Sequence, residues 1–336
     1  SAVCGTKEGA CSASAARADG LPRVVYSAVA LQREVTMRES FKRTYLFAVA
    51  ILLVGALFIP TGVDGADGRL MVSEAAPEPA EVPDDGKLRI IGFGAHPDDN
   101  ELRAAGSAAL WAARGHHVKF VSCTNGDIGH WGMSGGALAR RRTEEVKHCA
   151  EILGIESQVL DIHDGELMPT LENRKTIVRL IRRWKADIVI CHRPNDYHPD
   201  HRNVGLLVRD AAFMVTVPFF CPNTPYLEEN PVFMYYSDRF TRPYPFEADV
   251  VVGIDDVIEK KLDTVLALES QFLEGGCFGS PELYPPDDPE QRAARRKKVL
   301  RRFRARFARP AERFREGLVK WYGEERAGDI NYAEAF

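Results

Sequence analysis

The sequence predicts an α/β protein: a single domain with a Rossmann-like, mostly parallel sheet and helices on both faces. Two observations lead to this prediction. From residue 87 onward, short apolar β-prone runs alternate with segments of helical periodicity. Strand–helix–strand repetition is the pattern of a parallel sheet covered by helices. The composition, 45% hydrophobic and 27% charged over 336 residues, is ordinary for a globular protein.

Two N-terminal segments lie outside the predicted domain. Residues 1–36 are rich in Ala and Ser and lack sustained periodicity, so we interpret them as an upstream or disordered segment. Residues 37–68 begin with Met37 and basic residues, followed by the uncharged apolar run 45–59. This run is shorter than the ~20 residues that span a bilayer and fits the apolar part of a secretory signal peptide. We therefore expect export to the periplasm or the extracellular space, with an uncleaved membrane anchor as the alternative.

The predicted domain covers residues 87–336 and follows a Pro-, Ala- and acid-rich linker at residues 69–86. Apolar residues spaced three and four apart predict helices over residues 145–153 and 177–184. No two cysteines form a CxxC pair, so a cysteine-based zinc site is not expected. Strands are expected at six runs, namely residues 88–93, 117–123, 159–162, 187–191, 232–236 and 249–254.

One basic segment stands out in a chain whose net charge is −4. From Arg292 to Arg315 there are twelve Lys or Arg residues and one acid. Apolar residues four apart predict an amphipathic helix, which Pro310 should break or kink. The simpler interpretation is a solvated helix face. The alternative is a surface glycan-binding protein in which this segment attracts an anionic surface polymer or a membrane. A nucleic-acid partner is not expected for an exported protein.

Two polar clusters follow predicted strands and carry the chemistry of the chain. Residues 95–99 read AHPDD, and residues 192–201 read HRPNDYHPDH. Because the carboxyl ends of parallel strands meet at one edge of a sheet, both clusters should lie together. Imidazole and carboxylate suit Zn²⁺ or a similar ion, and the remaining Asp and His residues are available for proton transfer. Each cluster alone could be a turn or a helix cap, for instance with Asp200 as the cap. Their joint occurrence favours metal-assisted amide hydrolysis.

These motifs together resemble the LmbE / PIG-L family of zinc-dependent N-acetylglucosaminyl deacetylases. The specific part of the resemblance is AHPDD near the start of the domain combined with HPDH at residues 198–201. The resemblance extends over most of residues 88–336. Weaker matches are TNGD at residues 124–127, the Arg142 and Glu145 spacing, Asp164 followed by glycine, and YAEAF at residues 332–336.

The resemblance implies roles for the residues of both clusters. Zn²⁺, or another divalent ion, would be bound by His96, Asp99 and His201. Asp98 would be the general base, and His198 would stabilise the oxyanion or act as acid. Asp200 would orient an imidazole. The residue types alone leave open which of the two aspartates is the ligand.

The resemblance also implies that the substrate is an N-acetylated amino sugar or glycoconjugate, with a related amidase on another amide as the alternative. The residues that match sugar-binding positions are Asp127, Arg142 and Asp164. Structural alternatives stay open, because Arg142 and Glu145 could form a surface pair and residues 164–165 a plain turn.

The chain departs from the family pattern next to the first cluster. Many relatives have Glu where this chain has Asn100, although Glu101 fits a common variant and is expected to support the ligands. Arg103 replaces a small residue that is often seen there, which should alter the rim of the pocket.

Overall fold

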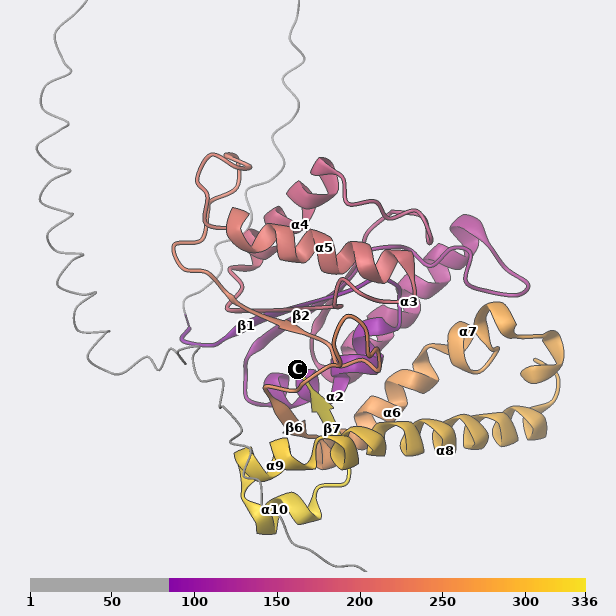
Figure 1. The fold of residues 1–336 in the computed structure, drawn as a ribbon. Helices are drawn as coiled ribbons and strands as arrows, with labels where there is room; N and C mark the ends of the chain where they lie inside the picture. The colour runs from indigo at the N-terminus through magenta and orange to yellow at the C-terminus, as the bar shows by residue number, and fades with distance from the viewer. Residues whose placement is uncertain (1–84) are drawn as a thin grey trace, which may run out of the picture. The chain divides into compact units, whose positions relative to one another are not determined.

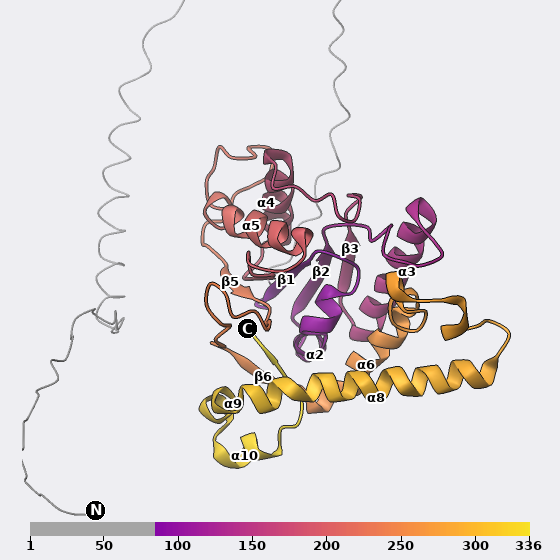
Figure 2. The ribbon, with the colours of Figure 1, turned by 45° about the vertical axis from the view of Figure 1, so that its right-hand side comes forward.

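The computed structural model describes residues 85–336 (Figures 1 and 2). The predicted upstream segment 1–36, the signal peptide or anchor 37–68 and nearly all of the linker 69–86 lie outside the described residues. These three assignments therefore stay predictions. Within the described part of the chain, no helix combines the length and the apolar character that crossing a membrane requires.

The central sheet has five parallel strands, which confirms the predicted fold class. Its order is β3-β2-β1-β4-β5, with β1 in the middle and fully buried along its length. The register pairs Phe93 of β1 with Cys191 of β4, so these neighbouring strands end at the same level. The strands are β1 (Arg89–Gly94), β2 (His117–Ser122), β3 (Glu156–Val159), β4 (Ile188–Cys191) and β5 (Val232–Tyr235).

Helices cover both faces of this sheet. α4 (Leu171–Trp184) and α5 (Pro199–Met214) pack on one face, where their apolar residues form a core with Ile91, Phe93 and Val189. α2 (Asp99–Ala113) and α3 (Gly135–Leu153) lie on the opposite face (Figure 1). The chain therefore enters α2 on one side of the sheet and α5 on the other.

The C-terminal third adds a helical layer and a second sheet. In that layer, α8 (Pro289–Arg313) runs along α6 (Ile258–Ala267), as Figure 2 shows, and it also contacts the C-terminal strand β7 (Ala333–Ala335). β6 (Val251–Gly253) and β7 (Ala333–Ala335) pair antiparallel. The remaining elements are η2 (Asp255–Val257), α6 (Ile258–Ala267), α7 (Glu269–Phe272), η3 (Gly276–Phe278), η4 (Pro281–Leu283), α8 (Pro289–Arg313), α9 (Arg315–Tyr322) and α10 (Glu324–Asp329).

Two local predictions differ from the structure, and a third is confirmed in a separate sheet. The run 159–162 was expected to be a strand, but the strand β3 covers Glu156–Val159, and the polar sequence of this edge strand hides its start. The strand predicted in the run 249–254 is present as β6, and it pairs with the C-terminal strand rather than with the parallel sheet. α8 continues through Pro310 to Arg313, because its buried face, which includes Phe307 and Ala311, continues across the proline.

Candidate active site

The two polar clusters meet at the carboxyl ends of β1 and β4. Residues 95–99 follow β1 directly, and residues 192–201 follow β4. Because α2 and α5 leave these adjacent strands toward opposite faces, this is the point where the strand order reverses. Open α/β sheets bind their ligands at such a point. The predicted meeting of the two clusters at one sheet edge is confirmed.

Helix starts orient the reactive side chains. Asp98 is the N-cap residue of α2 but makes no side-chain capping bond. Instead, Asp99 Oδ2 accepts the backbone N–H groups of Ala95 (3.0 Å) and His96 (2.9 Å). At α5 the N-cap is His198, whose Nδ1 accepts the N–H of Asp200 at 3.3 Å. The alternative that Asp200 caps this helix is therefore wrong, because the helix begins at Pro199 and Asp200 already lies in its first turn.

Close packing of α5 on the end of β4 places His201. Gly205 lies one turn further along α5, and a Cβ atom at this position would come within 2.7 Å of the His192 carbonyl oxygen. Only glycine allows the helix to approach the strand end this closely. The imidazole of His201 consequently lies over the strand end and stacks on that of His192, with ring centroids 4.2 Å apart.

Three donor atoms from the predicted ligands form a nearly equilateral triangle. His96 Nδ1 lies 3.5 Å from Asp99 Oδ2 and 3.2 Å from His201 Nε2, and the third side, from His201 Nε2 to Asp99 Oδ2, is 3.4 Å. For a tetrahedral ion with bonds of about 2.1 Å, ligand atoms lie about 3.4 Å apart. The donor set of two imidazoles and one carboxylate, with these separations, fits a divalent zinc-type ion.

The ring nitrogens of His96 and His201 that do not belong to the triangle face carboxylate groups. His96 Nε2 lies 3.0 Å from Asp164 Oδ1 and 3.3 Å from Asp200 Oδ2, so it carries the proton and leaves the Nδ1 lone pair for a ligand. His201 Nδ1 lies 3.2 Å from Asp196 Oδ2, although the two atoms are not aligned as a hydrogen bond. Both imidazoles are thus oriented by carboxylates, as ligating histidines usually are.

Sequence reasoning missed two residues of this cluster. His192 Nε2 lies 3.2 Å from Asp99 Oδ2 and could replace His96 in a second triad with Asp99 and His201. The N–H of Ala95, however, approaches His192 Nε2 at 3.4 Å and competes for its lone pair. The position of His192 directly after β4 was the available signal. For Asp196, which faces His201, no sequence signal distinguished it from other loop acids.

The two adjacent aspartates differ in their protonation tendencies. Burial, and then the negative charge of Asp99, raises the pKa of Asp98. Burial would also raise the pKa of Asp99, but the imidazoles of His201 and His192 hold this pKa well below its ordinary value. Environments that separate the pKa values of two neighbouring carboxyl groups in this way are typical of an acid–base pair at an active site. These directions match what the resemblance implies for Asp99 as ligand and Asp98 as proton acceptor, and that division of roles stays a prediction.

His198 lies beside the triangle rather than in it. Its ring meets that of His96 edge-on, with centroids 4.5 Å apart, and it is partly exposed. Burial, and then the neighbouring His96 and His201, lowers its pKa. Tyr197 borders the same side, with its ring centroid 5.9 Å from that of His198.

Asp200 and Asp164 lie behind His96. The Asp200 carboxylate is fully buried and also accepts the N–H groups of Gly165 (2.7 Å) and Leu167 (3.3 Å). Asp164 contacts His96 directly, so residues 164–165 are more than a plain turn. Burial would lower the pKa of His96, but its bonds to Asp164 and Asp200 outweigh this effect and raise the pKa well above its ordinary value.

Asp127 and Arg142 hold the loop after β2. Asp127 Oδ2 lies 2.6 Å from His163 Nδ1, while its Oδ1 accepts the N–H of Asp164 at 3.1 Å. Arg142 is buried beneath the loop and donates to the carbonyl oxygen of Gly129 at 2.7 Å. The alternative of a surface pair with Glu145 is wrong, because Glu145 pairs with Arg141 and Ser270 instead.

Asn100, which departs from the family pattern, and the neighbouring Glu101 are both buried. Asn100 Oδ1 accepts the hydroxyl of Tyr236 at 2.6 Å, and its amide donates to the Val121 carbonyl, which ties the start of α2 to the sheet. Burial raises the pKa of Glu101 to about 8, and its Oε2 has no hydrogen-bond partner. Support of the ligands by Glu101 stays a prediction.

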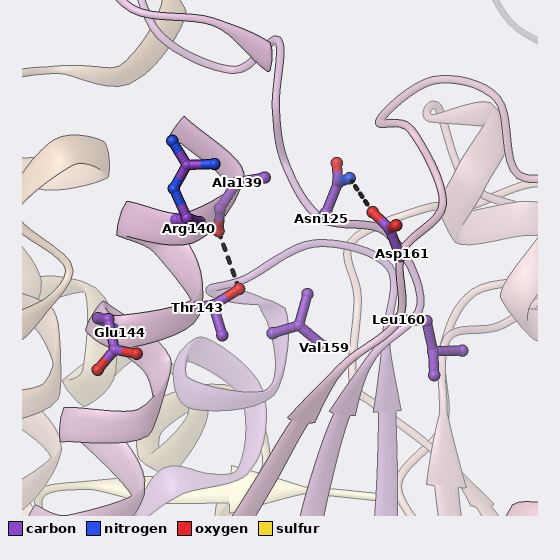
Figure 3. Close-up of a pocket in the computed structure, with 8 residues that line it drawn as sticks. All are labelled: Asn125, Ala139, Arg140, Thr143, Glu144, Val159, Leu160 and Asp161. Carbon is purple, nitrogen blue, oxygen red and sulfur yellow. Dashed lines mark hydrogen bonds between the residues drawn. The ribbon is translucent and has the colours of Figure 1, made fainter. Parts of the chain in front are cut away.

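A hollow of about 330 Å³ lies between the start of α3 and the segment that follows β3 (Figure 3). Asn125 forms part of its lining and donates to Asp161 at 3.1 Å, while its Oδ1 accepts the N–H of Asp127. The hollow contains none of the histidines or aspartates of the triangle. The candidate active site is therefore defined by its donor atoms and not by this hollow.

Comparisons with known proteins relate this chain to a family of de-N-acetylases. A family profile described as PIG-L, GlcNAc-PI de-N-acetylase, matches residues 91–212. A diacetylchitobiose deacetylase from Thermococcus kodakarensis is 35% identical over 190 residues, which cover 53% of this chain and 68% of that protein. A 4-oxalmesaconate hydratase from Pseudomonas putida is 26% identical over 53% of this chain and 71% of its own length.

A solved structure supports the fold. The N,N'-diacetylchitobiose deacetylase from Pyrococcus horikoshii superposes with a TM-score of 0.53 at 24% identity, covering 74% of this chain and 82% of that chain. The segment that the family profile matches, residues 91–212, contains β4 and most of β1, together with the two polar clusters that follow these strands. The chain belongs to the PIG-L family of GlcNAc-PI de-N-acetylases.

Proposed function

We propose that this protein is a metal-dependent hydrolase that removes the acetyl group from an N-acetylated amino sugar or glycoconjugate. The observation that carries the proposal is the triangle of donor atoms on His96, Asp99 and His201, with the buried carboxyl group of Asp98 next to Asp99 in the chain. Relatives that deacetylate N-acetylated sugars support amide hydrolysis as the reaction of this chain. Zinc is the ion we propose for the triangle, because its donor set and spacing suit that ion.

In this proposal, Asp98 and His198 each have a separate role in the reaction. A divalent ion held by the triangle would polarise the amide carbonyl and lower the pKa of a water molecule. Asp98 accepts a proton from the attacking water, for which its raised pKa suits it. His198 stabilises the negative charge on the carbonyl oxygen of the tetrahedral intermediate. The proton then passes to the leaving nitrogen, the C–N bond breaks, and acetate and a free amine result.

The residues around the triangle have positioning roles in this proposal. Asp200 and Asp164 fix the ring of His96, and Asp196 fixes that of His201. Asp127 and Arg142 order the loop after β2, which forms one wall of the site. Direct contact of Asp127 with the sugar stays a prediction from the resemblance. Action outside the cytoplasm also stays a proposal, based on the export pattern of residues 37–68.

Acetate release from a panel of N-acetylated sugars tests the reaction. Asp98→Asn should retain its metal but lose about 10²- to 10⁴-fold in kcat, whereas the exposed Asp263→Asn control should stay active. Metal analysis should find about one ion per chain, and none in His201→Ala. Activity of a metal-free protein, or full activity of Asp98→Asn, would contradict the mechanism. Because a hydratase is among the relatives, absence of acetate together with water addition to an unsaturated acid would overturn the proposed reaction.

A further inference from the structure

The segment between β5 and β6 borders the candidate active site but has little core of its own. Residues 239–245 are exposed apart from Phe240, which is half-buried. We refer to residues 238–246 as the strap. The centroid of the Phe240 ring lies 6.3 Å from that of Tyr197, and the Tyr197 centroid lies 5.7 Å from that of His201. Contacts from outside the strap must therefore hold it beside the site.

One guanidinium group from the second polar cluster lies inside the strap. Arg193 follows His192 and is buried, and its Nε and Nη2 donate to the two carboxylate oxygens of Asp238, each at 2.6 Å. The same guanidinium group donates to the carbonyl oxygens of Phe240 (3.3 Å) and Tyr244 (3.2 Å). Arg193 therefore binds both the beginning and the end of the strap, which folds around it.

The pairing of Arg193 with Asp238 is buried as well as bidentate. The two side chains are only 4% and 8% exposed. The guanidinium carbon lies 5.6 Å from the centroid of the Tyr244 ring and 5.7 Å from that of Phe246. A guanidinium group presents its donors as a planar fork, which the ammonium group of a lysine cannot reproduce. The strap is therefore held in a defined geometry and not merely attracted by the charge.

The strap in turn contacts the loop that leads from Arg193 into α5. The side-chain amide of Asn195 donates to the carbonyl oxygen of Arg242 in the strap at 3.0 Å. On the other side of the loop, Arg202 of α5 donates to the carbonyl oxygens of Asp196 (2.9 Å) and Tyr197 (3.0 Å). The loop is thus held between the strap and the start of α5.

Two side chains of this loop belong to the candidate active site. Asp196 Oδ2 lies 3.2 Å from His201 Nδ1, and Asp196 Oδ1 accepts the N–H of His198 at 3.1 Å. We propose that Arg193 is a positioning residue, because it holds the strap that supports this loop. Through the loop it sets the orientation of His201 and the place of His198. The consequence for His198 rests on the proposed function, whereas the orientation of His201 as a metal ligand requires only that the triangle binds an ion.

Arg193→Lys tests the proposal, because it keeps the charge and removes the fork. Its affinity for Zn²⁺, measured in competition with a chelator, should fall about tenfold or more. Its kcat for acetate release should fall about 10²-fold, with a much smaller change in KM. Arg182→Lys is the matched control, because Arg182 is also buried and donates to backbone carbonyl oxygens of residues 214–224, at the opposite end of α5 from His201. The control should lower Tm but leave zinc affinity and kcat unchanged.

A double variant separates positioning from stability. In Arg193→Met with Asp238→Leu neither charge is left buried alone, so Tm should recover most of the loss seen in Arg193→Met. Zinc affinity and kcat should stay as low as in Arg193→Met, because apolar side chains do not reproduce the fork. Recovery of both together with Tm would overturn the positioning role.

The single variants give two further decisive results. Unchanged zinc affinity and kcat in Arg193→Lys would overturn the proposal, and so would equal losses in Arg182→Lys, which indicate general destabilisation. If the wild-type protein releases no acetate from any N-acetylated sugar, the proposed function fails. The zinc affinities of Arg193→Lys and of the double variant then still decide whether Arg193 positions His201.

Discussion

A buried ion pair between Glu334 of the last strand and Lys261 of α6 also binds α2, the helix that begins at the candidate active site. Glu334 of β7 accepts the N–H groups of Gly106 (2.9 Å) and Ser107 (2.7 Å) in the middle of α2. Lys261 of α6 donates to the same carboxylate and, at 3.0 Å, to the carbonyl oxygen of Leu102. Both charged side chains are only 2% exposed. Because α2 begins at the Asp98–Asp99 pair, this contact fixes the helix that presents the proposed base and ligand.

Removing one partner should leave the other buried without its counter-charge. For Glu334→Gln, the Lys261 ammonium stays buried without its counter-charge, and we expect a loss of about 3–5 kcal/mol in the free energy of unfolding. For a domain of this size that loss corresponds to a decrease in Tm of about 6–20 °C. Lys261→Met retains packing on Phe307, whose ring lies 4.3 Å from the ammonium, and should cost a similar amount. The double variant should cost less than the sum of the two, because neither charge is then left alone.

Urea unfolding at neutral pH measures all three variants. Glu316→Gln is the control, because this glutamate is exposed on α9 and should change the free energy of unfolding by less than about 0.5 kcal/mol. If both single variants lose less than about 1 kcal/mol, the pair does not hold α2. Additive losses in the double variant would likewise refute direct coupling between Lys261 and Glu334.

Two further predictions concern other carboxylates. Asp200→Asn removes the negative charge that faces His96 and should reduce metal affinity about 10- to 100-fold. Competition with a chelator measures this affinity, and an unchanged value would exclude a positioning role for Asp200. Burial would raise the pKa of Glu274, but its bonds to Arg141 (2.7 and 2.8 Å) lower it below 4.5. The stability that this carboxylate contributes is therefore present above about pH 4.5 and is lost as the pH falls through the lowered pKa. The difference in unfolding free energy between wild type and Glu274→Gln should shrink between about pH 7 and about pH 3, and a constant difference would contradict the assignment.

Features encoded by local patterns could be predicted from the sequence. The alternation of apolar runs and helical periodicity was sufficient for the parallel sheet, and the position of AHPDD and HPDH after two strands was sufficient to bring them together. Hydrophobic periodicity reports which face of an element is buried, and strand ends follow from it. The limits of this reasoning are visible at β3, whose mixed polar sequence at the sheet edge carries little periodic signal.

Pairings between distant residues could not be predicted in the same way. The contact of Asp196 with His201 depends on the path of a loop, and the burial of Arg142 depends on where residues 126–129 fold back over α3. For Asp200, a shift of the helix start by two residues changes its role from a cap to a buried acceptor beside His96. Sequence patterns predict helix starts only to within a few residues, so side-chain roles at such boundaries depend on the three-dimensional structure.

The basic segment gives the strongest case for this dependence. In the sequence its arginines are equivalent, and their number alone suggests one cationic surface. In the structure Arg304 pairs with Glu259 of α6, and Arg292 pairs with Glu269 of α7. Arg295 donates instead to the backbone carbonyl oxygens of Phe272 and Leu273. Charge spacing in the sequence therefore predicts the presence of a cationic helix, but the partners of each charge, which belong to other elements, decide what that charge contributes to the fold.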